Sequence, residues 1–412
     1  MTPGILFNLI VLFIIFEFIL SRILDWLNLK YWKEDLPEDA EGIYDQEKYK
    51  QAQKYNKEVS KFGLITASFG LILILLMLFF DGFAYLDQWI RTSNTEHHVW
   101  LPLLFFGILF IAQDILTLPF SLYSTFVIEE KYGFNNTRIG TFITDKLKAY
   151  LLTFLIGGAL LAGLAFFYSI SGSNFWWIGW VIVSSFSIFM AMFYTSLFVP
   201  IFNKLSPLEE GSLLSSIRSY ASNVNFPLKE IWVMDSSKRS SKANAFFSGI
   251  GPRKSIVLFD TLIKDHSEEE ITAVLAHEVG HFKKKHVLQG IALSIFQMGL
   301  LFFLFGWLSG YPKLAEVLGA EKNSFHLAII AFSLLYSPVS MLTGIFMNMY
   351  SRKNEYEADS FAKTTYDSQY LISALKKLSS NNLSNLTPHP AYVFFHYSHP
   401  PLLKRIRALK SV

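Results

Sequence analysis

The chain of 412 residues contains no cysteine, and only 17% of its residues are charged. The missing thiols exclude disulfides, cysteine-ligated zinc, iron–sulfur clusters and thiol catalysis. Soluble domains carry roughly a quarter charged residues, so the low charge content excludes a disordered chain, a coiled coil and an ordinary soluble enzyme. The net charge is only +3 and is spread over the loops. We therefore expect no nucleic-acid partner.

Apolar residues make up 52% of the chain and fall in blocks long enough to cross a lipid bilayer. A spanning helix needs about 20 mostly apolar residues. The first block has no preceding Lys or Arg and no small-residue cleavage site after it, so we expect a retained anchor rather than a signal peptide. Seven spans are predicted, at Ile5–Leu24, Gly63–Phe80, Leu101–Leu122, Tyr150–Ile170, Trp176–Phe198, Val287–Leu308 and Leu327–Met349.

The basic residues predict the orientation of these spans. Lys and Arg accumulate in short cytoplasmic loops, and here they are frequent after spans one, three, five and seven but sparse after the others. The alternation predicts that the N-terminus lies outside and that both long polar segments are cytoplasmic. We divide the chain into spans one to five with their loops (1–200), a cytoplasmic loop (201–286), spans six and seven (287–350) and a cytoplasmic tail (351–412).

The cytoplasmic loop has the pattern of a small mixed α+β unit. Ile231–Met234 and Ser255–Phe259 read as short strands. Ser267 is a candidate N-cap, and Glu270 stands in the capping-box position. A helix is therefore predicted from Ile271 through the following histidines, and we expect it to continue into span six.

A metal-binding motif lies on this predicted helix, at His277-Glu278-Val279-Gly280-His281. Residues four apart share one helix face, so both imidazoles can bind a single cation. Glu278 is offset from that face and can reach a metal-bound water, whose proton it would accept. A short motif of this kind also arises by chance, and a third ligand is needed to support it.

The best candidate for the third ligand is Glu355, because a catalytic zinc usually has three protein ligands and this residue continues span seven on the cytoplasmic side. Asp359 is one helical turn further on and can accept the free ring N–H of a zinc-bound histidine. The alternative is that Glu355 belongs to an ordinary solvated helix face. We expect Glu357 to point elsewhere. His286, off the helix face of the motif, is interpreted as an interfacial residue and not as a ligand.

Four more stretches accompany this motif in a fixed order from span three to the C-terminus. They are Val127–Asn135, Ser237–Phe247, Ile256–Leu262 and Tyr397–Arg405. Together with the histidine motif and its downstream carboxylates, these stretches form a set that is far more specific than the motif alone. The whole chain thereby resembles the type I CaaX prenyl proteases, which are integral-membrane zinc metalloproteases.

The resemblance implies a fold and a metal site. The fold would be an all-α polytopic membrane protein with seven transmembrane helices that enclose an intramembrane chamber, and a small cytoplasmic zincin-like α+β metalloprotease portion. One Zn²⁺ per chain would be bound by His277, His281 and Glu355, with Glu278 as the catalytic base. Asp359 and Arg405 would support this site.

The resemblance also implies a substrate and its binding groups. Asn244 and Ala245 would bind the peptide backbone beside an edge strand, and His399 would stabilise the oxyanion. A residue before proline avoids the helical region, so we expect His399 in an extended turn that enters the helix Leu402–Lys410. The substrate would be a prenylated or hydrophobic C-terminal peptide, cut by a monomer in the endoplasmic reticulum membrane of a eukaryote or the inner membrane of a bacterium.

Two other functions stay open on sequence grounds. A membrane-protein quality-control protease shares the zinc motif, although such enzymes have fewer spans. A non-enzymatic polytopic membrane protein with a structural metal would instead show a closed site of four ligands.

Overall fold

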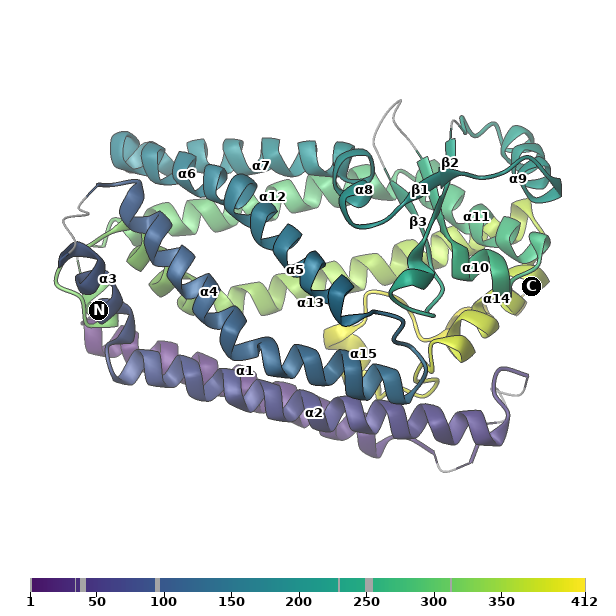
Figure 1. The fold of residues 1–412 in the computed structure, drawn as a ribbon, viewed down its shortest axis with the longest axis horizontal. Coiled ribbons are helices and arrows are strands. Elements are labelled where there is room, and N and C mark those ends of the chain that lie inside the picture. Colours follow the sequence, from purple (N-terminus) through teal and green to yellow (C-terminus); the bar gives the residue numbers. More distant parts are fainter. Residues whose placement is uncertain are drawn as a thin grey trace.

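The structure is a computed structural model that describes residues 2–33, 35–37, 42–92, 97–228, 230–248, 255–311 and 313–411. Long helices run along the longest axis of the molecule, and a small sheet with shorter helices forms one end (Figure 1). The C-terminus lies at the end with the sheet, whereas the N-terminus lies at the opposite end (Figure 1).

Six helical stretches of the described residues are long and apolar enough to cross a membrane. They comprise α1 (Pro3–Lys30), α2 (Gln46–Phe79), α4 (Trp100–Tyr123) with the π-helical turn η2 (Ser124–Glu129), the stretch Ile139–Phe202, α12 (His286–Ser309) and α13 (Phe325–Thr365). The shorter helix α3 (Gly82–Thr92) and the 3₁₀ turn η7 (Ala315–Leu318) lie near the N-terminal end of the bundle (Figure 1).

The 64-residue stretch Ile139–Phe202 contains both the fourth and the fifth predicted span. It reverses direction at Gly172, whose φ of +54° lies in a region that favours glycine. The number of spans is therefore close to the predicted seven. Its parts are α5 (Ile139–Leu152), η3 (Thr153–Gly157), α6 (Gly158–Ser171), η4 (Gly172–Asn174), α7 (Phe175–Phe193), η5 (Tyr194–Phe198) and α8 (Val199–Phe202).

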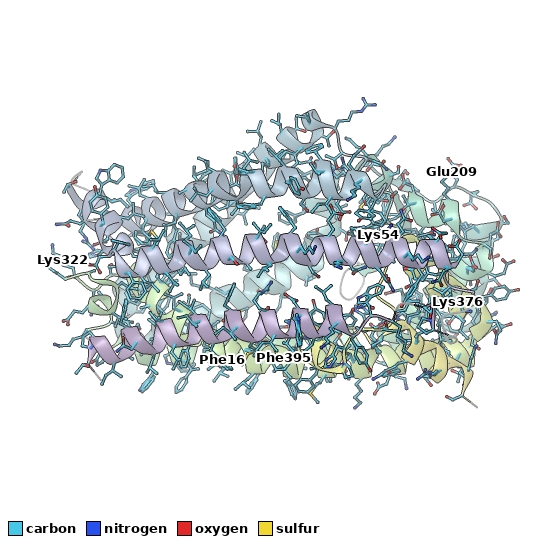
Figure 2. The ribbon with its side chains drawn as sticks, turned by 90° about the horizontal axis from the view of Figure 1, so that it is seen from below. Phe16, Lys54, Glu209, Lys322, Lys376 and Phe395 are labelled. Atoms are coloured by element: carbon cyan, nitrogen blue, oxygen red, sulfur yellow. The ribbon has the colours of Figure 1, made fainter. Side chains whose placement is uncertain are left out.

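The outer surface of the bundle is apolar. Large side chains such as Phe79, Phe296 and Trp307 are exposed, and only 6–17% of the most apolar window of each spanning stretch is buried. Figure 2 shows Glu209 and Lys376 at the end with the sheet and Lys322 at the opposite end, with Phe16 on a helix between them. An apolar belt of this size is incompatible with water and suits the interior of a bilayer.

Two carboxylates, Glu17 and Asp114, lie inside the predicted apolar spans, and they face a cavity or other protein groups, as is typical of such residues. Asp114 accepts a hydrogen bond from Lys146 Nζ at 2.6 Å and another from the Tyr150 hydroxyl. Glu17 lines a cavity of about 380 Å³ with residues of α6, α7, α12 and α13, among them Tyr336.

The small sheet has four strands in the order β1-β2-β4-β3. Its strands are β1 (Leu205–Pro207), β2 (Glu230–Met234), β3 (Ala245–Ser248) and β4 (Ser255–Phe259). The two predicted strands correspond to β2 and β4, which pair in parallel. The third strand, β3, pairs antiparallel with β4 and lies at an edge of the sheet.

Short helices accompany the sheet and complete the core at this end of the molecule. They are α9 (Ser212–Asn223), α10 (Asp260–Asp265), α11 (Glu268–Lys283), α14 (Ser368–Asn381), α15 (Pro390–His396) and α16 (Leu402–Lys410). The helix α11 lies in the middle of this core, where Ile271, Leu275 and Val279 are buried.

The start of α11 is fixed by the predicted capping box between Ser267 and Glu270. The Glu270 side chain is buried and also accepts hydrogen bonds from Lys377 Nζ at 2.7 Å and Ser373 Oγ at 2.6 Å. This carboxylate therefore joins α11 to α14.

Replacing Glu270 by alanine is expected to lower the free energy of unfolding by about 1–3 kcal/mol, because the cap and a buried ion pair are both lost. Burial raises the pKa of Glu270, but Lys377 and Ser373 outweigh this effect and hold the pKa below its usual value. The carboxylate therefore contributes stability above its unfolded pKa, and this contribution is lost as the pH falls from about 4.3 through the lower folded value.

Thermal unfolding in detergent checks this prediction. The Glu270→Ala midpoint should lie below that of the unmodified protein at pH 7, with a smaller difference near pH 4. Glu269→Ala, at an exposed neighbouring position, is the matched control. Equal midpoints at pH 7 would contradict the stabilising role of Glu270.

The prediction that α11 continues into span six is wrong. The helix α11 ends at Lys283, Lys285 has a left-handed φ of +60°, and α12 begins at His286. The break separates a helix packed in the core beside the sheet from a helix with an apolar outer surface. By contrast, α13 continues span seven without interruption through Glu355, as predicted.

Candidate metal centre

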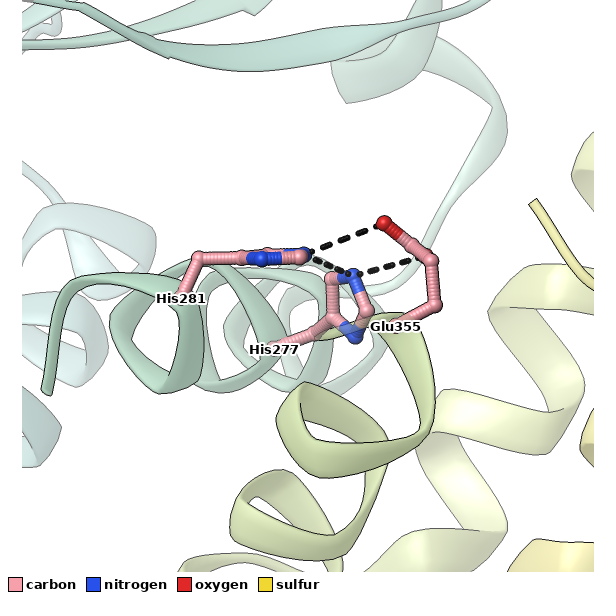
Figure 3. A group of neighbouring side chains, drawn as sticks. All are labelled: His277, His281 and Glu355. Atoms are coloured by element: carbon pink, nitrogen blue, oxygen red, sulfur yellow. Dashed lines mark hydrogen bonds and ion pairs between the residues drawn. The ribbon is translucent and has the colours of Figure 1, made fainter. Parts of the chain in front are cut away.

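The two histidines of the motif lie one turn apart on α11 and point toward α13 (Figure 3). Their Nε2 atoms are 3.1 Å apart, and His277 is buried. Gly280 lets the two helices approach closely, because a Cβ at this position would lie 3.0 Å from the Cα of Ala358. This close crossing places the residue one turn before Ala358, Glu355, beside both imidazoles.

Glu355 completes a group of three potential metal ligands. One carboxylate oxygen, Oε1, lies 3.2 Å from His281 Nε2, and the other, Oε2, lies 3.5 Å from His277 Nε2 (Figure 3). The residue is only 4% exposed. Its Oε2 is buried and makes no hydrogen bond in the described part of the chain, although Arg405 Nη1 lies 3.4 Å away.

The donor set fits a zinc ion. Two imidazole nitrogens and a carboxylate oxygen are zinc ligands, and tetrahedral donors about 2.0–2.2 Å from the metal lie about 3.3–3.5 Å from one another. The observed separations of 3.1–3.5 Å, which involve both oxygens of Glu355, are close to this spacing, and one ligand atom from each residue lies within 4.8 Å of the other two. A buried oxygen without a hydrogen-bond partner is unusual in a folded protein, and a cation between the donors would satisfy it.

His277 is held from its far side by an ion pair. Its Nδ1 lies 2.9 Å from Asp359 Oδ1, and Arg405 binds both oxygens of Asp359 at 2.8 and 2.6 Å. We assign the ring proton to Nδ1 from this contact, which leaves the lone pair of Nε2 directed toward the other two donors.

The carboxylates of Asp359 and Glu355 also control the protonation of His277. Burial lowers the pKa of His277, but hydrogen bonds to Asp359 and Glu355 outweigh it and raise the pKa to about 9. Burial likewise lowers the pKa of Arg405, but the hydrogen bond and the charge of Asp359 raise this pKa by more. The net pKa lies above its usual value, so the guanidinium stays charged. A cation that binds Nε2 therefore competes with a proton, and its binding releases that proton.

Glu278 is the next residue on α11 and is half-buried. Within the described residues its carboxylate makes no hydrogen bond or ion pair, so its oxygens are free to accept a proton. Its charge interacts with that of Arg405. This arrangement differs from that of Glu355, whose oxygens both face the histidines.

His399 approaches the metal centre from the C-terminal tail. It lies in a turn before Pro400, and α16 begins at Leu402, as the proline pattern predicts. Its Nε2 is 3.4 Å from Glu355 Oε1, although the side chain is 64% exposed. The imidazole is thus at the solvent-facing side of the three donors.

Ala245 begins the edge strand β3 and Asn244 immediately precedes it, and both residues lie outside the network of contacts around the donors in the described part of the structure. The Asn244 side chain accepts a hydrogen bond from Ala245 N at 2.9 Å, and its carbonyl accepts one from Phe259 N at 3.1 Å. Asn244 is exposed. The structure therefore brings the predicted metal-binding and supporting residues together but does not join them directly to this pair.

Two residues near the site make a contact that the sequence did not predict. His286 is buried, and its Nδ1 lies 3.0 Å from Nδ1 of His281. Glu357 makes no contact with the three donors in the described part of the structure, as expected, but its Oε2 lies 3.1 Å from His286 Nε2. The only sequence signal for the contact between His281 and His286 was their separation of five residues. This separation allows contact only if the helix breaks between the two histidines.

Comparison with known proteins indicates the family of this chain. Residues 25–204 match the CAAX prenyl protease N-terminal family model, described as five membrane helices, and residues 207–412 match peptidase family M48. The chain is 35% identical to CAAX prenyl protease 1 of Saccharomyces cerevisiae, over 92% of this chain and 89% of that protein. It is 32% identical to the human CAAX prenyl protease 1 homolog, over the same shares of the two chains.

The fold is also similar to a solved structure. The crystal structure of S. mikatae Ste24p matches with a TM-score of 0.92 and 33% identity, over 98% of this chain and 99% of that one. Both halves of the sequence and the whole fold thus indicate one family. The chain is an integral-membrane metalloprotease that belongs to peptidase family M48, with the N-terminal membrane region of the CAAX prenyl proteases.

Proposed function

We propose that this protein is a monomeric zinc endopeptidase that removes the C-terminal tripeptide of prenylated CaaX proteins. The observation that carries the proposal is the group of two imidazoles and one carboxylate with zinc-like spacing, beside a second carboxylate, Glu278, that makes no hydrogen bond or ion pair with a described residue. Three protein donors leave one position for water or substrate. A single Zn²⁺ per chain would occupy this group.

The residues around the three donors have separate roles in peptide hydrolysis. When bound, zinc acts as a Lewis acid and lowers the pKa of a bound water. Glu278 accepts the proton of the attacking water and returns it to the leaving amine. His399, next to Glu355, donates a hydrogen bond to the oxygen that becomes negative. Asp359 and Arg405 hold His277 in the orientation that directs Nε2 inward.

The edge strand β3 provides the binding surface for the peptide. The strand order β1-β2-β4-β3 leaves one side of β3 without a partner strand among the described strands. An extended peptide can pair with such an edge through main-chain hydrogen bonds, which require little specific sequence. Asn244 and Ala245, at the start of β3, would align the peptide backbone.

The metal centre would lie on the cytoplasmic side of the membrane. The three donors are at the end of the bundle that carries the sheet, opposite the N-terminus (Figure 1). The basic residues of 201–286 and 351–412 favour the cytoplasm for this end. The membrane would be the endoplasmic reticulum in a eukaryotic cell and the inner membrane in a bacterium.

Cleavage of a farnesylated CaaX peptide by the purified protein, with zinc measured by elemental analysis, tests the proposal. We expect one zinc per chain and release of the tripeptide, with loss of cleavage in a strong chelator and recovery when Zn²⁺ is restored. Equal or faster cleavage of a misfolded membrane protein would instead favour a quality-control protease. Bound zinc without cleavage of either substrate would favour a structural metal.

A further inference from the structure

The two histidines of the metal centre each contact a protein side chain through Nδ1, on the side away from the donors. His277 contacts Asp359, which in turn binds Arg405. His281 contacts His286 instead, and this second histidine contacts Glu357. Both sets of contacts end at a cation. The first ends at Arg405, and the second ends at Lys353, whose Nζ lies 3.7 Å from Glu357 Oε1.

The break between α11 and α12 is what makes the second set of contacts possible. In a continuous helix a residue five positions after His281 would be rotated by about 140° around the axis and displaced by about 7.5 Å along it. Instead, the left-handed Lys285 ends the first helix, and His286 returns beside His281, with ring centroids 5.1 Å apart. A non-glycine residue in this conformation costs about 1–2 kcal/mol, so the surrounding contacts must stabilise the turn.

The hydrogen-bond directions are consistent with metal binding by His281. Its Nε2 faces His277 and Glu355, so binding of a metal ion there requires the lone pair at Nε2 and leaves the ring proton at Nδ1. That proton is donated to Nδ1 of His286, which therefore carries its own proton at Nε2. The Nε2–H of His286 is then donated to the carboxylate of Glu357. Only this arrangement of protons satisfies both contacts with neutral rings.

We propose that His286 and Glu357 are positioning residues that fix the tautomer and orientation of His281 for metal binding. This role matches that of Asp359 and Arg405 toward His277. Partners of this kind raise the basicity of a metal-bound imidazole and hold its ring in place, and their loss typically weakens metal binding about 10–100-fold. The inference rests on the proposed zinc site and assigns it a second support.

Competition with a chromophoric zinc chelator tests this inference on the purified, full-length protein. We expect His286→Leu and Glu357→Ala each to weaken zinc binding about 10–100-fold. Glu357→Gln should weaken it less, because the amide oxygen can still accept the hydrogen bond from His286. The double variant should bind zinc no more weakly than His286→Leu alone, since the two residues act in series.

His266→Gln is the matched control, because it replaces a buried histidine that contacts the carbonyl of Leu262 and not the metal centre. It should bind zinc as the unmodified protein does. Zinc affinity within twofold of the unmodified protein in Glu357→Ala, whose side chain is 39% exposed, would overturn the inference even if His286→Leu failed to fold. The inference would also be overturned if the losses of zinc affinity caused by the two single substitutions added up in the double variant. An unmodified protein that binds no zinc would refute the zinc site itself.

Discussion

Replacing Glu278 by glutamine is expected to lower the rate of peptide cleavage by about 10²–10⁴-fold, the usual contribution of a general base. Glutamine has nearly the same shape, but its amide cannot accept the proton of the attacking water. Zinc content should be unchanged, because Glu278 is not one of the three donors and makes no hydrogen bond with a described residue. The effect should therefore fall on the chemical step alone.

Single-turnover cleavage of the farnesylated peptide, combined with elemental analysis of the same sample, measures both quantities. Glu269→Gln makes the same change of charge at an exposed position on α11 and should cleave normally. A Glu278→Gln protein that binds zinc and still cleaves at the normal rate would show that another group accepts the proton. Loss of zinc with loss of cleavage would show that Glu278 helps to hold the metal.

Replacing Glu355 by alanine is expected to weaken zinc binding by more than about 100-fold and to abolish cleavage. Loss of a direct ligand should exceed the 10–100-fold effect of losing an indirect one. The change removes the only carboxylate of the donor set, within 3.2 Å of His281 Nε2 and 3.5 Å of His277 Nε2. It also removes a buried negative charge beside Arg405, whose Nη1 lies 3.4 Å from Oε2.

Zinc retained after dialysis against a chelator measures this effect. Glu278→Gln is the matched control, because it removes a neighbouring negative charge and should keep the metal. Circular dichroism and gel filtration establish whether the Glu355→Ala protein is folded, which the long α13 should allow. A folded Glu355→Ala protein with normal zinc affinity would contradict the assignment of the third ligand.

The spanning helices were predictable because a bilayer imposes a simple rule on the sequence. Backbone polar groups must be satisfied within lipid, so each apolar block of membrane length has to be helical. The predicted spans from Ile5–Leu24 to Leu327–Met349 correspond to the long helices of the structure. The division of Ile139–Phe202 into spans four and five was predicted as well, and the structure adds that they are joined by a turn of a few residues at Gly172.

The three donors were also predictable, for two different reasons. The histidine pair follows from helix periodicity, which places residues four apart on one face. Glu355 follows from the continuation of span seven as a straight helix into the same compartment. Its contact with the histidines depends on the crossing of α11 and α13, which the small residues Gly280 and Ala358 permit.

By itself, therefore, the sequence determined the membrane helices, the placement of the histidine pair on one helix face and the capping of α11, because each depends on the spacing of neighbouring residues along one helix or on its length in lipid. Only the tertiary structure decided that α11 ends before His286 and that this residue contacts Glu357, 71 positions further along the chain. A single left-handed residue, Lys285, changes the direction of the chain, and the sequence periodicity does not predict this conformation. The contacts it creates depend on how two helices cross, which local sequence does not specify.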